Sequence, residues 1–337
     1  MSRVLGLSLG RTRSRYKQLP ISQIRACRVQ PPEIGDRAFP NFKIGKPDME
    51  SSASGRMIGG VAPILILLSL GSPAAAQNPA QSPKKTNYLR NIEVCNGSDR
   101  TSLEARINGC TALIEAHGTT TALTVAYNNR GNAYTAKGDY DRAIQDFDQS
   151  IKLNPTYAKP FNNRGVAYLR KGEYDLAIKA LDEAIKLNPN YGGAFANRAG
   201  AYLKKNEYDR AARDYDEAIR LEPNLEAVWN GRCWTRAILG ALQAALEDCT
   251  KALQSEPNNA AAYDSRGLIY LKMGQLGAAI DDYSSALRFE PKLASALYGR
   301  GLAKLKKGDK AGSDSDISAA KTIQAKIGDD FTRFGVQ

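Results

Sequence analysis

The chain has 337 residues and a formal net charge of +12, with 42% hydrophobic residues, five cysteines and one histidine. The charge is uneven, because residues 1–76 hold 11 Lys and Arg against 4 Asp and Glu, a net +7, which leaves +5 for residues 77–337. A nucleic-acid binder needs a concentrated basic stripe, so this mild excess argues against that class of protein. With a single histidine we also expect no metal site and no cofactor.

The first segment, residues 1–56, carries no motif of its own. We interpret it as a leader that is disordered, or that reflects a start assigned too far upstream, with the true start at Met49 or Met57. Residues 1–32 hold seven Lys and Arg and no Asp or Glu, as mitochondrial transit peptides do. The export signal that follows weighs against that interpretation.

Residues 57–76 have the features of a secretory signal peptide. Residues 57–70 form a short, mostly apolar run that Arg56 precedes, and three alanines end at Ala76, so we expect cleavage after Ala76. The product would be exported, and either periplasmic or extracellular. The run is shorter than the roughly 20 apolar residues of a comfortable membrane span. If it stays uncleaved, it would anchor the protein in the inner membrane, and only then do we expect contact with a membrane.

Two segments separate the signal from the repeats described next. We expect residues 77–100 to be an extended segment and residues 101–123 to form an N-terminal capping helix. Residues 112–116 echo residues 150–153, which end a later helix. A helix at this place would cover the apolar face of the first repeat, as terminal units of a repeat array must.

From residue 124 the chain repeats itself every 34 residues. A fixed period of this length indicates one supersecondary unit stacked on copies of itself, because a single unit cannot bury its apolar face alone. The period is clearest in the prolines that end each unit and stop its second helix, Pro155, Pro189, Pro223, Pro257 and Pro291. Glycine or asparagine between the two helices suits the left-handed conformation that ends a helix.

Large and small side chains recur within the unit at spacings that place them on one face of each helix. Counted with the proline as position 32, position 4 is mostly aromatic (Tyr127, Phe161, Phe195, Trp229, Tyr263, Leu297), and position 8 is small (Gly131, Gly165, Ala199, Cys233, Gly267, Gly301). Position 20 is alanine in five units (Ala143, Ala177, Ala211, Ala245, Ala279).

This pattern resembles the tetratricopeptide repeat (TPR) family. The resemblance implies an all-α, right-handed solenoid of helix-turn-helix units, with five full repeats at 124–157, 158–191, 192–225, 226–259 and 260–293. A weaker sixth unit, 294–325, reads as a polar end cap because Lys304 and Ser313 replace the usual aromatic and alanine, and residues 326–337 form a C-terminal tail. The resemblance further implies binding of a protein, or of a peptide laid in the concave groove.

Arginine stands at position 7 of every unit, where the family usually has an apolar residue. Position 23, on the facing helix, is aspartate in all units except the second, which has Ala180. We expect structural ion pairs within the repeats: Arg130 with Asp146, Arg198 with Asp214, Arg232 with Asp248, Arg266 with Asp282, and Arg300 with Asp316. Arg164 needs another carboxylate, for which Asp182 is a candidate, and it is the arginine most free to contact a ligand. A ladder of arginines for an acidic ligand is the weaker interpretation.

Four cysteines remain after residue 76, an even number that favours disulfides in an exported protein. Cys233 and Cys249 stand at positions 8 and 24 of one repeat, on facing sides of its two helices, so we expect them to pair. We expect Cys95 and Cys110 to join the leading segment to the capping helix. Two free buried cysteines in the fourth repeat are the alternative.

By the resemblance, positions 2, 5, 6, 9, 12 and 13 of the first helices line the groove. An amide both donates and accepts, so a row of asparagines suits an extended peptide backbone. The candidate partner-binding residues, which include Arg164, are Asn128, Asn129, Asn132, Lys159, Asn162, Asn163 and Asn197. Four of them, Asn132, Lys159, Asn163 and Asn197, match the general idea of a clamp for a terminal carboxylate. A solvated face without a ligand is the alternative for the asparagines.

The chain shows no nucleophile–histidine–acid set, no phosphate-binding glycine loop and no metal-ligand spacing. We therefore expect that the protein is not an enzyme and has no small-molecule substrate. The sequence therefore predicts a non-catalytic binding module or scaffold of the cell envelope with a protein or peptide partner. The competing hypothesis is a structural adaptor that self-associates through the ends or the convex face of the solenoid.

Overall fold

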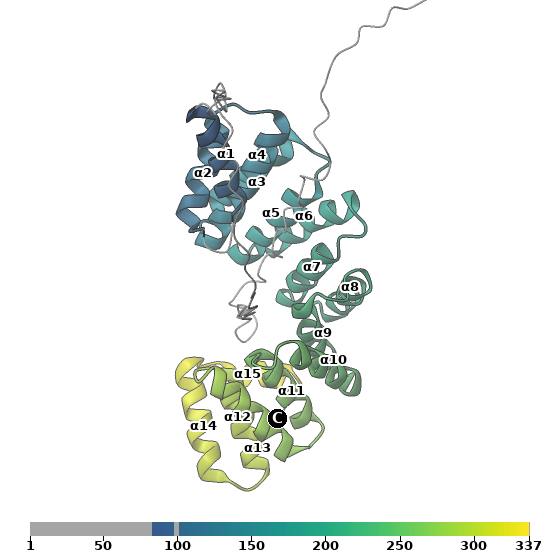
Figure 1. Cartoon of the computed structure of the whole chain (residues 1–337). Coiled ribbons are helices and arrows are strands. Elements are labelled where there is room, and N and C mark those ends of the chain that lie inside the picture. Colours follow the sequence, from purple (N-terminus) through teal and green to yellow (C-terminus); the bar gives the residue numbers. More distant parts are fainter. Residues whose placement is uncertain (1–82, 98–100, 337) are drawn as a thin grey trace, which may run out of the picture. The chain divides into compact units, whose positions relative to one another are not determined.

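The computed structural model describes residues 83–97 and 101–336, and this part of the chain forms fifteen α-helices and no strand (Figure 1). The helices are α1 (Pro83–Asn96), α2 (Leu103–Glu115), α3 (Thr120–Lys137), α4 (Tyr140–Leu153), α5 (Ala158–Lys171), α6 (Tyr174–Leu187), α7 (Gly192–Lys204), α8 (Tyr208–Leu221), α9 (Glu226–Ile238), α10 (Leu242–Ser255), α11 (Ala260–Lys272), α12 (Leu276–Phe289), α13 (Ala294–Lys306), α14 (Lys310–Ile323) and α15 (Ile327–Arg333). The expected all-α repeat solenoid is confirmed. The leader and the signal peptide lie outside the described residues.

Helices α3 to α14 are six antiparallel hairpins, and those from α5 on begin where the 34-residue period places them, at residues 158, 192, 226, 260 and 294. Each turn needs a left-handed residue, which Gly138 supplies after α3 with φ 86°. In the third repeat Asn206 takes this conformation with φ 59°, as the best non-glycine substitute.

The two helices of a hairpin approach closely because a small residue on one faces a large residue on the other. A Cβ added at Gly131 would lie 2.6 Å from Cε1 of Phe147, so the phenyl ring of α4 fills the space over this glycine of α3. The position-20 alanines, Ala143, Ala177, Ala211, Ala245 and Ala279, are all fully buried. This packing makes the interior of each repeat tight and apolar.

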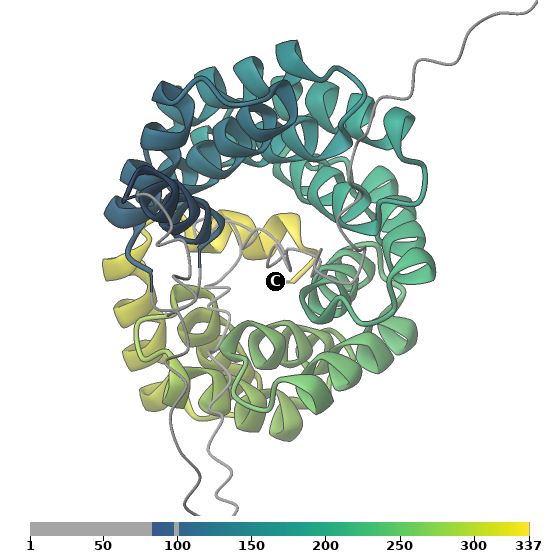
Figure 2. The same cartoon turned by 45° about the horizontal axis from the view of Figure 1, so that its top comes forward.

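Neighbouring hairpins stack mainly through the second helix of one and the first helix of the next, such as α4 with α5 and α12 with α13. First helices also contact one another, α3 with α5, α5 with α7 and α11 with α13, whereas contacts between successive second helices are sparse or absent. The first helices therefore lie on the inner side of the curve that the repeats follow, and the second helices on the outer side (Figure 2).

The expectation for residues 77–100 is wrong for the part that the structure describes, because residues 83–96 form a helix rather than an extended segment. Tyr88, Ile92 and Cys95, at spacings of four and three, share one face of α1 and pack against Cys110 and Leu113 of α2. α1 and α2 are thus a further hairpin ahead of the first repeat. The predicted capping helix, 101–123, corresponds to α2 and the beginning of α3.

The C-terminal end also departs from the expectations. Ser313 is fully buried instead of lying on a polar cap, and Lys304 is paired through its Nζ, 2.8 Å from Asp316 Oδ2. Residues 327–333 form a separate helix, α15, with Ile327 and Phe331 buried. The apolar residues at 327, 331, 334 and 336 turn the predicted tail into a packed element, because they bury surface against the inner helices.

Candidate binding surface

Six asparagines form one continuous row of side-chain hydrogen bonds across the inner helices of the first three repeats. Every amide donates its Nδ2 to the Oδ1 of the next, so all five bonds run in the same direction. They join Asn197 to Asn162 (2.9 Å), Asn162 to Asn163 (3.1 Å), Asn163 to Asn128 (2.9 Å), Asn128 to Asn129 (3.2 Å) and Asn129 to Asn96 (3.1 Å). An amide can serve as donor and acceptor at once, which makes such a row possible.

This row changes the expectation for the predicted groove residues. Asn128, Asn129, Asn162, Asn163 and Asn197 are between 0% and 8% exposed, because each lies where its helix meets the next inner helix. They are neither a solvated face nor freely exposed groove side chains. Asn132 and Lys159 are half-buried and remain accessible. Two of the four residues that match a carboxylate clamp, Asn163 and Asn197, already use their amides in the row.

Sequence reasoning missed Asn96, which lies at the end of α1, ahead of the first repeat. The helix that carries it was expected to be extended, so no pattern tied Asn96 to the repeated asparagines. Asn129 donates to it across 33 residues. The row therefore links the N-terminal hairpin to the repeats.

The structure brings together all five predicted Arg–Asp pairs. The shortest N–O distances are 2.6–2.8 Å, for Arg130 with Asp146, Arg198 with Asp214, Arg232 with Asp248, Arg266 with Asp282 and Arg300 with Asp316. In each pair Nε and Nη2 of the guanidinium donate to both carboxylate oxygens, the two-pronged geometry that arginine provides. The hydrogen bond to Asp146 raises the pKa of Arg130.

Three of the position-7 arginines bind a carboxylate of the preceding repeat. Their Nη1 atoms donate to a carboxylate at position 25 of the repeat before, over 2.6–2.8 Å: Arg164 to Asp148, Arg198 to Asp182 and Arg232 to Asp216. The suggested pairing of Arg164 with Asp182 is therefore wrong, because Asp182 lies beside the arginine of the next repeat. The recurrence of aspartate at position 25 marked these three carboxylates in the sequence, but it did not tell which arginine each of them meets.

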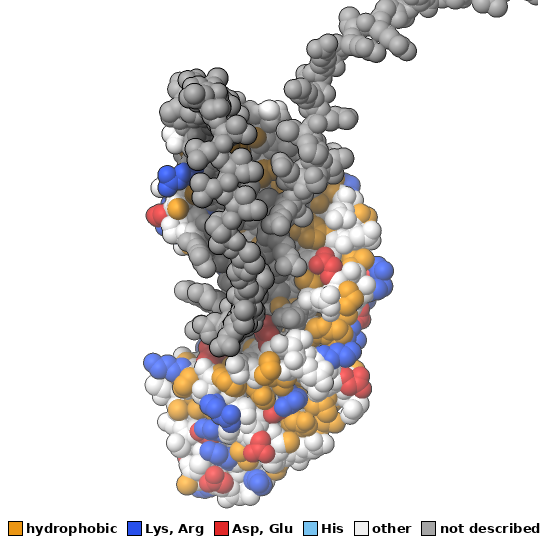
Figure 3. Space-filling view, viewed as in Figure 1, with side chains coloured by type: hydrophobic (Ala, Val, Ile, Leu, Met, Phe, Trp, Pro, Cys, Tyr) orange, Lys and Arg blue, Asp and Glu red, His pale blue; other side chains and the backbone are white. Residues whose placement is uncertain are grey.

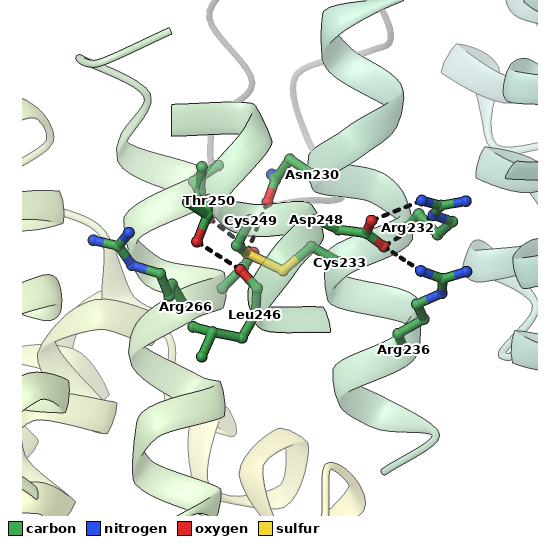
Figure 4. Close-up of a disulfide and its surroundings, with 12 residues drawn as sticks. Asn230, Arg232, Cys233, Arg236, Leu246, Asp248, Cys249, Thr250 and Arg266 are labelled. Carbon is green, nitrogen blue, oxygen red and sulfur yellow. Dashed lines mark hydrogen bonds and ion pairs between the residues drawn. A yellow bond between two sulfur atoms is a disulfide. The ribbon is translucent and has the colours of Figure 1, made fainter. Parts of the chain in front are cut away.

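The fourth repeat carries a disulfide beside the most extensive ion-pair cluster (Figure 4). Cys233 on α9 and Cys249 on α10 are bonded, with their Cα atoms 5.3 Å apart. Arg236, which replaces the usual tyrosine of position 11, lies 2.8 Å from Asp248 Oδ2 and 3.0 Å from Asp216 Oδ1. The second disulfide joins Cys95 of α1 to Cys110 of α2, with the Cα atoms 4.6 Å apart.

A single buried carboxylate stands on the inner side of the fifth repeat. Asp264, at position 5, is 1% exposed and accepts a hydrogen bond from Ser295 Oγ over 2.7 Å, while its Oδ1 has no partner. Burial raises the pKa of Asp264 to about 7. The equivalent residues of the first, second and fourth repeats are Asn128, Asn162 and Asn230, so a neutral side chain fits this environment better than a charged one.

On the face of the molecule that Figure 3 shows, basic and acidic side chains lie interspersed over α11 to α14. Within residues 83–97 and 101–336 no group of three or more His, Cys, Asp or Glu side chains is arranged to hold a metal ion. None of the helices in this part of the chain combines the length and apolarity that crossing a membrane requires.

Comparison with known proteins gives matches to repeat families and to solved structures. A family model described as "TPR repeat" matches residues 131–172 and 267–308. Models described as "Tetratricopeptide repeat" match residues 158–191, 193–225 and 249–281. No catalytic family is among these matches. None of the curated proteins matches the chain.

Two solved structures illustrate the likeness of the fold. A tetratricopeptide repeat protein from Parabacteroides merdae is 17% identical with a TM-score of 0.55, and the match covers 74% of this chain and 99% of that one. The pilF protein of Pseudomonas aeruginosa is 16% identical with a TM-score of 0.54, over 63% of this chain and 98% of its own. Together with the six stacked hairpins, the matched residues show that this chain carries tetratricopeptide repeats.

Proposed function

We propose that this protein is a non-catalytic scaffold of the cell envelope that holds a peptide or protein segment on the concave side of its repeats. Proteins with tetratricopeptide repeats bind other proteins in general. The observation that carries the finer proposal is the asparagine row on the inner helices α3, α5 and α7. Five consecutive hydrogen bonds between side-chain amides hold these helices in a fixed register, so the side chains beside the row keep fixed positions too.

The residues that would contact the ligand are neighbours of the row rather than the row itself. Asn132 on α3 and Lys159 on α5 are half-buried, so each keeps a polar end in contact with solvent. An amide and an ammonium group can bind the carbonyl oxygens of an extended peptide, or its terminal carboxylate. A groove that is already rigid loses little conformational entropy on binding.

The two disulfides support the envelope location. Cys95–Cys110 and Cys233–Cys249 use all four cysteines that follow the proposed cleavage site. Disulfides form and persist in oxidising compartments, such as the periplasm or the exterior of the cell.

Site-specific photo-crosslinking in the native host tests the groove. A photoreactive amino acid is placed at Asn132 or Lys159, with Lys179 on the outer helix α6, an exposed lysine, as the matched control. We expect both inner positions to crosslink to the same segment of the same partner, and Lys179 to give no such product. Products from Lys179 alone, or products with twice the mass of the chain, would favour the self-associating adaptor instead.

The intact mass of the protein from its native host tests export. We expect a chain that begins at Gln77 and that is about 4 Da lighter before reduction than after, because two disulfides remove four hydrogen atoms. A mass that retains the leader, or four thiols that react with an alkylating agent without reduction, would contradict the envelope location and leave the groove proposal standing.

A further inference from the structure

The C-terminal helix α15 lies on the inner side of the repeats, in the part built by α9, α11 and α13 (Figure 2). The ring of Phe334 meets that of Trp234 on α9 edge-on, with the centroids 5.0 Å apart. The ring of Phe331 packs against that of Tyr298 on α13, with the centroids 4.9 Å apart. The C-terminal segment thus contacts repeats that are two units apart.

A lysine of the fifth repeat holds the end of the same segment. Lys272 Nζ on α11 donates to the carbonyl oxygen of Phe334 over 2.9 Å, and also to that of Ala237 at the end of α9 over 2.8 Å. Carbonyls at a helix C-terminus have no partner within the helix, and a lysine ammonium suits them. Lys272 therefore binds the backbone of the segment, whatever side chains the segment carries.

The residues that contact the segment stand at repeat positions that face the groove. Trp234 is at position 9, Lys272 at position 13 and Tyr298 at position 5 of their repeats. A helix that merely continued the array would cover the apolar face of α13 and α14. α15 instead reaches back to α9, so it covers the concave surface of the C-terminal repeats.

We propose that residues 327–336 act as an internal ligand, which occupies this concave surface until a partner helix with two aromatic side chains three positions apart replaces it. This inference rests on the proposed function and adds the chemistry of the partner. The spacing is that of Phe331, which packs against Tyr298, and Phe334, which packs against Trp234. Lys272 would bind the last carbonyls of the partner helix as it binds Phe334.

Displacement involves few groups, because the segment is short and contributes four apolar side chains to the contact, Ile327, Phe331, Phe334 and Val336. α15 has only seven residues, and helices far below about 12 residues are marginal on their own in water. The other hydrogen bonds and ion pairs of its side chains are exposed. They lie within the segment, as between Arg333 Nη2 and Asp330 Oδ1 at 2.5 Å, or join it to the residues just before it. A tethered segment of this kind competes at an effective concentration on the order of millimolar. A free peptide of about 0.1 mM affinity would then bind the intact chain roughly tenfold more weakly than a chain with an open groove.

Fluorescence anisotropy with a synthetic peptide tests this proposal. The probe is a fluorescein-labelled peptide of residues 326–337, and the proteins are residues 77–337 with and without the double change Phe331→Ala and Phe334→Ala. We expect the double variant to bind the probe about tenfold more tightly than the intact chain. Adding Trp234→Ala should abolish this gain, whereas adding Lys179→Ala, an exposed position on the outer helix α6, should leave it unchanged. A probe with both phenylalanines replaced by alanine should not bind.

Equal binding to intact chain and folded double variant, or no binding to either, would overturn the proposal. Hydrogen exchange on the intact chain decides the matter even if the double variant does not fold. We expect the amides of α15 to exchange at least roughly 100-fold faster than those of α13, because α15 opens without the repeats. Equal protection would show that α15 is a permanent part of the fold. Crosslinking at Lys159 is independent of these results, so a failure here leaves the proposed function intact.

Discussion

Arg198 and Asp182 belong to different repeats, and their ion pair joins α7 to α6 of the repeat before it. Arg198 Nη1 lies 2.7 Å from Asp182 Oδ1, while its Nε lies 2.7 Å from Asp214 Oδ2 in its own repeat. One planar guanidinium therefore couples the contact within a repeat to the contact between repeats. A lysine could not reproduce this geometry, because its ammonium is a single point of charge.

Replacing Arg198 by alanine should destabilise the protein far more than replacing Arg164 by alanine. Arg198→Ala strands Asp214, which is 6% exposed, and such a buried, unpaired charge costs about 3–5 kcal/mol. Arg164→Ala leaves only Asp148 without its partner, and the side chain of Asp148 is 49% exposed, so the loss of the pair should cost at most about 1 kcal/mol. Urea unfolding midpoints with unchanged m-values provide the measurement. Equal losses in the two variants would show that the in-repeat aspartate does not decide the effect.

The asparagine row should be more sensitive in its middle than at its end. Asn162→Ala removes two bonds at once and leaves the Nδ2 of Asn197 and the Oδ1 of Asn163 without partners. Asn197→Ala removes one bond and leaves only the Oδ1 of Asn162 without its donor. Since an unsatisfied buried group costs about 1–3 kcal/mol, we expect the free energy of unfolding to fall about twice as far for Asn162→Ala. The same urea titration checks this, and a larger effect at Asn197 would contradict the row as a continuous unit.

The buried carboxylate of Asp264 should make the protein less stable as pH rises. Burial raises its pKa from the ordinary 3.8 to about 7 in the folded state, so the folded protein binds a proton that the unfolded chain releases. Below about pH 4 Asp264 is protonated in both states and does not lower the free energy of unfolding. As pH rises through about 7, the free energy of unfolding falls by up to a few kcal/mol. Asp264→Asn should remove this slope and raise the melting temperature at pH 8. If the variant melts with the same pH dependence as the natural chain, Asp264 is not the group responsible.

The two disulfides should stabilise different parts of the protein. They are separated by 15 and 16 residues along the chain, so the chain-entropy argument assigns each a similar value of about 3 kcal/mol. The double change Cys233→Ala and Cys249→Ala should lower the main unfolding transition, because these cysteines lie in the middle of the stacked repeats. The double change Cys95→Ala and Cys110→Ala should instead speed hydrogen exchange in α1 and α2, with little effect on α5 to α14. Matching exchange profiles for the two variants would argue against this division.

Much of this protein could be predicted from the sequence, because each repeat encodes its own hairpin within 34 residues. The spacing of large and small side chains, the turn glycines and the closing prolines determined where α5 to α14 begin. The pairing of Arg198 with Asp214 and of Cys233 with Cys249 also followed, since both pairs lie within one hairpin. Such contacts depend only on helix period and on the antiparallel arrangement of two helices.

Contacts between repeats were decided only by the tertiary structure. Which carboxylate reaches Arg164, and whether Asn128 and Asn163 meet each other or the solvent, depends on the stagger between neighbouring hairpins. No local spacing encodes that stagger. The helices α1 and α15 lie outside the period, so their sequences carried only a weak signal. They fold where they do because their apolar side chains find buried surface on the repeats, and that surface exists only once the repeats have stacked.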